Sequence, residues 1–295
     1  MRRSTRCARP VPSYRVHERD DHQRLSTGVH RVRKLSVYII AYNEAEKIAD
    51  AIDSVRWADE VIVADSHSTD DTARIAESMG ARVVQIEFTG FGALRNEAIR
   101  ACSHDWIFSL DSDERCTVAV RDEIRAILAE AEPAHGAYHV PRRNYFLGRE
   151  IRHSGWYPNF RQPQLFRRDA MRYEDSPVHE GYEMIAPGAT VGQLRQAIWQ
   201  LPYKDLAEVI AKMNRYSTLG ASKPRQAGSS FAKALGHGSW AFLRHYVFKA
   251  GVLDGWAGFV IALAYFEVTF YRYAKAVELA HRAEWDDGWK NILKR

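Results

Sequence analysis

Two aspartates separated by a single residue follow an apolar run in the stretch "WIFSLDSDE". Asp111 and Asp113 carry like charges, and burial at the end of a strand would increase the cost of that repulsion. A divalent cation with oxygen ligands offsets the repulsion, and the phosphates of a substrate can complete its coordination shell. The spacing therefore predicts a metal site for a phosphate-bearing substrate, with a solvated surface turn as the alternative interpretation.

Two other charged residues stand where they could bind parts of a nucleotide. Asp65 ends the apolar run "EVIVAD", and a carboxylate there can accept hydrogen bonds from a nucleobase N–H or a ribose hydroxyl. Arg95 follows Gly90 and Gly92 near the start of an expected helix, from which a guanidinium could reach a diphosphate. The simpler interpretations, an acid at a helix N-terminus and an ordinary helix-face arginine, stay open.

The second half of the chain mixes arginines with aromatic residues. Aromatic faces stack on sugar rings and arginines pair with phosphates, which suits a phosphorylated glycolipid acceptor. RNA would also suit this mixture, but no recognised nucleic-acid module accompanies it, so we expect no nucleic-acid partner. The residues concerned are Arg142, Arg143, Arg152, Arg161, Arg167, Tyr145, Trp156 and Tyr157.

Short β-rich runs alternate with helical ones from Leu35 onward, which predicts parallel strands joined by right-handed helical crossovers. Ligands collect at the carboxyl ends of such strands, so residues 42–44, Asp65 and Asp111 should meet on one rim. Asn43 and Glu46 have the spacing of a capping box for the first helix. The expected strands are 35–41, 60–65, 81–87 and 105–111, and the expected helices are 44–55, 69–80 and 91–102.

The chain has 295 residues, of which 46% are apolar, enough for one large domain or two modest ones. Its net charge of +5 hides a division, because residues 1–34 carry +7, residues 35–140 carry −11 and residues 141–295 carry +9. An acidic part joined to a basic part suits a site that holds a cation and receives an anion. Chance surface charge is the alternative.

Two features of the sequence indicate the cellular compartment of the protein. Residues 1–34 are Arg-rich and lack the apolar core of a secretory signal, which predicts a disordered basic tail outside the fold. Cys7, Cys102 and Cys116 form no CxxC pair, so they indicate a reducing compartment rather than a disulfide framework or a zinc site.

The last third returns to helices near Tyr203, after irregular sequence with short strands such as 163–168. Its longest uncharged stretch, residues 255–266, has twelve residues, whereas a membrane-spanning helix needs roughly twenty. Two interpretations stay open for this stretch: a core-packing helix pair, or a helix in the membrane interface beside Arg244, Lys249, Arg272 and Lys275.

The motifs "LSVYIIAYNE", "EVIVADSHSTDDT", "GFGALRNEAI" and "WIFSLDSDE" occur in the order and spacing seen in family 2 glycosyltransferases of the GT-A fold, which the chain resembles. The later "NYFLGREIRHSGWYPNFRQPQLFRRD" and "SPVHEGY" resemble the bacterial lipopolysaccharide core branch of the WaaE/KdtX type. The resemblance covers roughly residues 35–280. It implies an α/β fold with a mixed, Rossmann-like sheet flanked by helices. The catalytic domain would span 35–200, with a nucleotide-sugar half to 133 and an acceptor half from 134, and a helical region would follow over 201–295.

The resemblance also implies roles for the residues of the donor site. Asp65 would bind the base of a nucleotide-sugar, Tyr42 and Glu44 would line its pocket, and Asp111 and Asp113 would hold Mn²⁺ or Mg²⁺ against its diphosphate. Arg95 is assigned to the same site. Ser66 stands where many members have a second acid, which removes one acceptor of hydrogen bonds. The chain lacks the QxxRW element of processive synthases, which favours transfer of a single sugar.

Such enzymes invert the anomeric centre in one displacement, so the acceptor hydroxyl needs a base. We choose Glu180 in "PVHEGY", with Asp175 and Glu174 as reserves. His179 would complete the metal shell, orient Glu180, or have a structural role only. The residues assigned to the acceptor are Arg142, Trp156, Tyr157, Arg161 and His179.

The predicted function is transfer of one hexose, with UDP-glucose as the chosen donor, to a lipopolysaccharide core or related lipid-linked acceptor. The protein would be cytoplasmic and peripheral to the cytoplasmic face of the inner membrane. Alternatives are transfer to polyprenyl phosphate, a haloacid-dehalogenase-type phosphatase with Asp111 as nucleophile, and a catalytically silent membrane-interaction protein.

Overall fold

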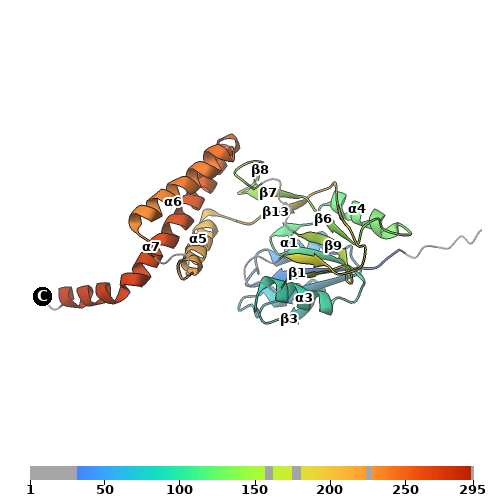
Figure 1. The fold of residues 1–295 in the computed structure, drawn as a ribbon. Helices are drawn as coiled ribbons and strands as arrows, with labels where there is room; N and C mark the ends of the chain where they lie inside the picture. The colour runs from blue at the N-terminus through green and yellow to red at the C-terminus, as the bar shows by residue number, and fades with distance from the viewer. Residues whose placement is uncertain (1–31, 157–161, 175–180, 224–227, 294–295) are drawn as a thin grey trace, which may run out of the picture. The chain divides into compact units, whose positions relative to one another are not determined.

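The structure, a computed structural model, describes residues 32–156, 162–174, 181–223 and 228–293. Its largest sheet has seven strands in the order β12-β6-β9-β4-β1-β2-β3 (Figure 1). Neighbouring strands run parallel, except that β9 is antiparallel to both β4 and β6. The strands are β1 (Leu35–Ala41), β2 (Glu60–Asp65), β3 (Arg82–Gln85), β4 (Trp106–Asp111), β6 (Ala137–His139), β9 (Pro163–Arg167) and β12 (Val191–Gln193).

Both faces of this sheet are covered, which explains why its inner strands are apolar almost throughout. On β1, Val37 and Ile39 join one buried cluster, and the intervening Tyr38 joins the cluster on the opposite face. The first cluster is completed by α1 (Ile48–Val55), α2 (Thr72–Ser78) and α4 (Val118–Ala129), and the second by α3 (Phe91–Ala101) and β10 (Met171–Tyr173). β10 pairs antiparallel with β11 (Tyr182–Met184).

A second sheet, of four strands, begins directly after the aspartate pair. β5 (Glu114–Arg115) pairs antiparallel with β13 (Ile198–Gln200), which runs parallel to β7 (Arg142–Phe146). β7 then forms a hairpin with β8 (Arg149–Ile151). The turn that carries Asp111 and Asp113 therefore connects the two sheets, and strands from both hold it.

Helices form the remainder of the described chain. α5 (Leu206–Ala221) and α6 (Phe231–Leu243) each begin with a side-chain cap, from Asp205 and Ser230 respectively. A π-helical turn η2 (Arg244–Phe248) and a 3₁₀ turn η3 (Gly251–Asp254) lead to the long helix α7 (Trp256–Leu293). Val209 of α5 and Ile261 of α7 share a buried cluster with Phe146.

The α/β class and the mixed sheet are as predicted, and β1, β2 and β4 lie within or at the expected limits. The predicted capping box is wrong. α1 begins four residues later than expected, because Asn43 has a left-handed φ of 54° and its Oδ1 accepts from the Thr69 backbone N–H at 2.8 Å. The chain changes from strands to helices between β13 and α5, near the predicted boundary at residue 200, and the division into domains stays a prediction. Residues 1–31 of the expected tail lie outside the described residues.

The two interpretations of residues 255–266 can be compared with α7. Ala257, Ile261 and Ala262 are buried, as a core-packing helix requires, while Trp256, Phe259 and Leu263 are exposed. In the part of the chain that the structure describes, no helix combines the length and the apolar character needed to cross a membrane.

Candidate functional site

The carboxyl ends of β1, β2 and β4 lie side by side. The strand register places Ala41 beside Asp65 and Ile40 beside Asp111. The loop after β1 is tied to the loop after β2, since the Asn43 backbone N–H donates to Ser68 Oγ at 2.8 Å. The structure thus brings the ends of all three strands to one rim, as the parallel topology predicts.

Asp111 is fixed from two directions. Its Oδ1 accepts from Arg95 Nη2 at 2.8 Å, and its backbone N–H donates to Glu114 Oε2 at 3.0 Å. Arg95 is itself buried, and its Nη1 donates to Ser109 Oγ at 3.0 Å. The structure therefore changes the assignment of Arg95 to a diphosphate. Its guanidinium is bonded to Asp111 and Ser109 and exposes little surface to which a ligand could bind.

Glu114 is the centre of a buried network beneath the aspartate pair. It has 0% exposure and accepts from Arg142 Nε and from Gln164 Nε2, the latter at 2.9 Å. Because Arg142 is also buried and is paired with this carboxylate, it is not on the surface where an acceptor phosphate could bind. The structure thus places Arg142, which the sequence assigns to the acceptor, as a buried support for the turn that carries Asp111 and Asp113.

Asp113 lies in a field of negative charge. Burial and the nearby carboxylates of Asp111 and Glu114 together raise the pKa of the Asp113 carboxyl to about 7, although Lys212 and Lys47 lower it. Three acids within four residues of one turn disfavour one another's ionisation unless a cation is present. The residues therefore fit a divalent cation, although among the described residues no group of three His, Cys, Asp or Glu side chains is arranged to hold one.

Asp65 ends β2 as expected, but its contacts differ from those expected of a base-binding acid. It has 0% exposure, its Oδ2 accepts from the Ser68 backbone N–H at 3.0 Å, and its Oδ1 accepts from Ser68 Oγ. In this arrangement the Asp65 carboxylate stabilises the loop after β2. A nucleobase would contact this loop rather than the buried carboxylate itself. The neighbouring Ser66 Oγ is buried without a hydrogen-bond partner among the described residues.

Tyr42 and Glu44 follow β1 on the same rim. Tyr42 is exposed, and Glu44 is anchored through its backbone N–H, which donates to Thr72 Oγ1 at 2.8 Å. The Glu44 carboxylate lies 3.6 Å from Lys47 Nζ. These positions leave both side chains available to a ligand.

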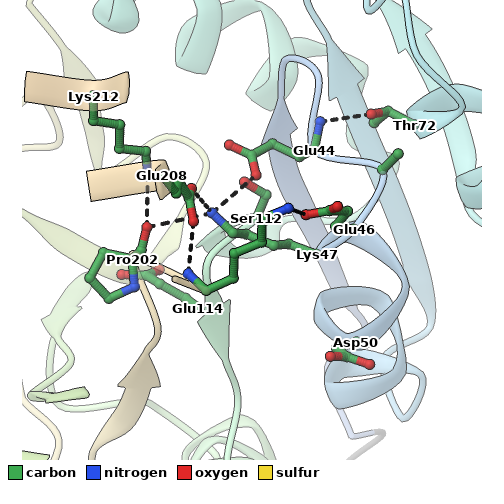
Figure 2. A network of polar contacts seen from close by, with 12 residues as sticks. Glu44, Glu46, Lys47, Asp50, Thr72, Ser112, Glu114, Pro202, Glu208 and Lys212 are labelled. Atoms are coloured by element: carbon green, nitrogen blue, oxygen red, sulfur yellow. Dashed lines mark hydrogen bonds and ion pairs between the residues drawn. The ribbon is translucent and has the colours of Figure 1, made fainter. Parts of the chain in front are cut away.

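A cluster of lysines and acids joins this rim to α5 (Figure 2). Lys47 Nζ donates to the Glu208 carboxylate, and Lys212 Nζ lies 3.2 Å from Glu208 Oε1 and donates to Pro202 O at 2.8 Å. Both lysines lower the pKa of Asp113, so their charge acts at the aspartate pair. Lys47 and Lys212, from different parts of the chain, therefore both lie near Asp113, and both contact the Glu208 carboxylate.

Trp156, which the sequence assigns to the acceptor, lies in an aromatic cluster. Trp156 packs against Phe146 and Tyr203, with ring centroids 6.0 Å and 6.3 Å apart, and its carbonyl accepts from Asn144 Nδ2 at 2.7 Å. Tyr145 packs against the exposed Trp199 at 5.7 Å. Tyr157, Arg161, Asp175, His179 and Glu180 lie outside the described residues.

One buried carboxylate ties the segment before Trp156 to the C-terminal helices. Asp254 of η3 accepts from Ser154 Oγ at 2.7 Å and from the His153 backbone N–H at 3.2 Å. It also contacts His153 Nδ1 at 3.1 Å and the Arg152 backbone N–H at 3.2 Å. The loop after β8 is therefore positioned by a residue about a hundred positions further along the chain.

Sequence reasoning missed Glu114, Gln164, Lys47, Lys212 and Glu208. The acid at position 114 directly follows the DxD spacing, and a third acid so close to two others was a signal that it must be paired. Lys47 and Lys212 offered no comparable signal, because single lysines on helices are normally solvated.

The chain can now be compared with known proteins. The family model for glycosyl transferase family 2 matches residues 36–186. The lipopolysaccharide core biosynthesis glycosyltransferase LpsC of Rhizobium meliloti is 33% identical over 256 residues, which cover 82% of this chain and 91% of LpsC. A protein of Rickettsia bellii described as an uncharacterised glycosyltransferase is 29% identical over 262 residues, covering 84% of this chain and 87% of that protein.

A solved structure of glucosyl-3-phosphoglycerate synthase from Mycobacterium tuberculosis, in complex with Mn²⁺ and UDP-glucose, is 31% identical over the aligned part. The alignment covers 38% of this chain and 44% of that structure, with a TM-score of 0.32. This chain thus matches less than half of the length of that enzyme.

The mixed sheet, with Asp65 and Asp111 at the ends of β2 and β4 and Glu44 in the loop after β1, together with the family match, defines an enzyme of the GT-A glycosyltransferase class. The extent of the family match and the similarity to LpsC are decisive for the family: the chain belongs to glycosyl transferase family 2. The predicted enzyme class is confirmed.

Proposed function

We propose that the enzyme transfers one hexose from a UDP-sugar, with UDP-glucose as the chosen donor, to a lipopolysaccharide core or related lipid-linked acceptor, with inversion at the anomeric carbon. The observation that carries the proposal is the aspartate pair at the end of β4, with Asp111 fixed by Arg95 and by Glu114. The similarity to LpsC supports the choice of acceptor class.

In this proposal the donor lies along the rim formed by β1, β2 and β4. Tyr42 and Glu44 contact the nucleoside, and the loop held by Asp65 contacts the base. Asp111 and Asp113 would hold the Mn²⁺ or Mg²⁺, which neutralises the leaving diphosphate when bound. Lys47 and Lys212 add positive charge on the same side.

The chemical step requires one bond to form and one to break. The acceptor hydroxyl oxygen attacks the anomeric carbon, the bond from that carbon to the diphosphate oxygen breaks, and the hydroxyl proton passes to a carboxylate. We assign that carboxylate to Glu180, with Asp175 as the reserve, because both stand in the acceptor half of the sequence. No covalent intermediate with the protein is needed.

The acceptor site uses the aromatic residues beside β7 and β8. Trp156 offers a partly exposed ring for a sugar, and we assign Tyr157, Arg161 and His179 to the same site on the sequence. Large apolar side chains on the C-terminal helices are exposed, which favours peripheral binding to the cytoplasmic face of the inner membrane. They include Trp240, Val247, Phe248, Leu253 and Trp256.

The test is sugar transfer with UDP-, GDP- and ADP-sugars onto deacylated core oligosaccharide and onto a short isoprenyl phosphate, with and without Mn²⁺. We expect transfer from a UDP-sugar to the oligosaccharide, dependent on the metal and reduced at least about a hundredfold in Asp113→Asn. The matched control is Asp53→Asn, since Asp53 is an exposed acid far along α1. Full activity of Asp113→Asn would refute the metal assignment. Transfer to the isoprenyl phosphate alone would show that polyprenyl phosphate, and not the core oligosaccharide, is the acceptor.

A further inference from the structure

α6 and α7 pack side by side (Figure 1). A groove of about 390 Å³ runs along them. The residues that line it come from α6 and the following η2 on one side and from α7 on the other, at spacings of three, four, seven and eight residues. The groove is separate from the rim that carries Asp111 and Asp113.

The antiparallel register of the two helices explains why a hollow remains there. His245 stacks on Tyr265 with ring centroids 3.6 Å apart, and one pair further His237 stacks on Tyr273 at 4.7 Å. Between these two stacks the lining includes two small side chains, Ala241 of α6 and Thr269 of α7. The groove therefore has an aromatic stack at each end and small side chains between them.

Two arginines give the groove its charge. Arg244 and Arg272 both line it, and none of the described residues that line it is acidic. Neither guanidinium has an ion pair among the described residues. The Arg272 side chain packs against Gly220 of α5, and its Nε is buried there without a hydrogen-bond partner among those residues. Guanidinium groups bind phosphate oxygens in a forked geometry.

The surroundings of the groove indicate what kind of phosphate it would meet. Trp240 belongs to its lining and is exposed, and Val247, Phe248 and Leu253 are exposed just beyond its end. Apolar and aromatic side chains beside cations are the pattern of a surface that lies in the head-group region of a bilayer. A free phosphate ion would make no favourable contact with these apolar side chains.

We propose that the groove between α6 and α7 binds the phosphate head group of an anionic membrane lipid, through Arg244 and Arg272. This inference rests on the proposed membrane association and gives it a specific site. It does not depend on the identity of the donor or acceptor sugar.

The test measures binding of the whole protein to vesicles. Three compositions are compared: phosphatidylcholine alone, phosphatidylcholine with phosphatidic acid, and phosphatidylcholine with sulfatide, which carries negative charge without an anionic phosphate. The double variant R244Q/R272Q is matched by K233Q/R282Q, which removes one exposed charge from α6 and one from α7, both outside the groove. A second variant, Ala241→Leu, fills the hollow and keeps both arginines.

We expect tighter binding to phosphatidic acid than to sulfatide. R244Q/R272Q should lose at least about tenfold more affinity for phosphatidic acid vesicles than K233Q/R282Q, and Ala241→Leu should lose the preference for phosphatidic acid. Equal losses in the two double variants, or an unchanged preference in Ala241→Leu, would overturn the site. A thermal shift with inorganic phosphate that needs Arg244 and Arg272, without any such dependence on vesicles, would overturn the lipid assignment.

Sugar transfer to a soluble acceptor, measured in parallel, separates the two proposals. If R244Q/R272Q keeps sugar transfer and loses vesicle binding, the result supports the groove as the lipid-binding site. Wild-type protein that binds vesicles through the groove but transfers no sugar leaves the groove in place and refutes the proposed reaction.

Discussion

At the scale of single residues, the most consequential side chain near the site is one that a ligand cannot reach. Glu114 is buried, and its carboxylate accepts from the Asp111 backbone N–H, Gln164 and Arg142. A charged group can be buried at this position because each of its bonds is to a donor, one of them a guanidinium. Its contacts set the backbone of the turn that carries both aspartates.

Replacing Glu114 with glutamine should destabilise the protein by about 3–5 kcal/mol, because Arg142 would remain buried without its counter-charge. Chemical denaturation followed by circular dichroism measures this free energy of unfolding. The control is Glu97→Gln, which breaks an exposed pair with Arg100 and should change stability by less than about 1 kcal/mol. Similar values for the two variants would show that Glu114 has no special role.

Glu60 gives a prediction for the effect of pH on stability. Burial alone would raise its pKa, but hydrogen bonds from Ser36, Arg82 and Ser103 outweigh burial and lower the pKa to about 2. Since the folded pKa lies below the unfolded value of about 4.3, these bonds stabilise the fold above that value, and the effect is lost as pH falls toward 2.

The variant Glu60→Gln should therefore be less stable than wild type by about 1–3 kcal/mol at neutral pH. The difference should shrink steadily below about pH 4.3, as thermal unfolding at a series of pH values would show. Glu77→Gln, which changes an exposed acid on α2, provides the control. A difference that does not change with pH would contradict the assigned cause.

At the scale of elements, the sequence predicts the parts of the fold whose cause is local. β1, β2 and β4 are apolar on both faces because the sheet is covered on both faces, so their limits could be read from the chain. Where α1 begins could not, because Asn43 bonds to Thr69 across the rim instead of capping the helix. The role of Arg142 was missed for the same reason, since its partner Glu114 is distant in sequence.

In the candidate site, too, the sequence predicts what the strand topology determines and misses contacts between distant segments. Asp65, Asp111 and the residues after β1 were placed on one rim because parallel strands bring their ends together. The lysines near Asp113 were not predicted, since Lys212 reaches the rim only through the path of β13 and α5. β13 pairs with β5, and the Leu201 backbone N–H donates to Asp113 O at 2.8 Å.

α5 should therefore affect binding of the donor. Lys212→Met removes one of two positive charges near Asp113, beside which the proposed donor would place its diphosphate. We expect the KM for the donor to rise about tenfold with a smaller change in kcat. Arg215→Gln, on an exposed position of the same helix, should leave both constants unchanged. Equal donor KM values for the two variants would exclude α5 from the donor site.

At the scale of the whole molecule, the division of charge seen in the sequence has a structural counterpart. The acidic segment supplies Asp111, Asp113 and Glu114, and the basic segment supplies Arg142 beneath them and Lys212 beside them. The acids and bases of the two segments therefore meet at one place. Cation and donor should consequently bind together, since each reduces the unfavourable charge that the other would face alone.

Thermal unfolding should reveal this coupling. UDP-glucose and Mn²⁺ together should raise the midpoint of unfolding by more than the two separate shifts combined, with a stabilisation of about 2.7 kcal/mol when the donor stands at a hundred times its Kd. Asp113→Asn should abolish the excess and leave the unliganded midpoint near that of wild type or above it, because Asp113 is held among like charges. Additive shifts in the wild type would argue against a shared site.

The arrangement of β6 and β9 has a consequence for how such enzymes can diversify. These strands are neighbours in the large sheet, and the chain between them leaves that sheet, forms β7 and β8, and returns. Because the segment between β6 and β9 begins and ends in neighbouring strands of the large sheet, a homologous segment could be exchanged without altering the strands that carry the aspartates. One residue inside it is not exchangeable, because Arg142 neutralises Glu114. A chimera that exchanges this segment must keep an arginine at the start of β7, because without it the turn that carries Asp111 and Asp113 loses its buried support.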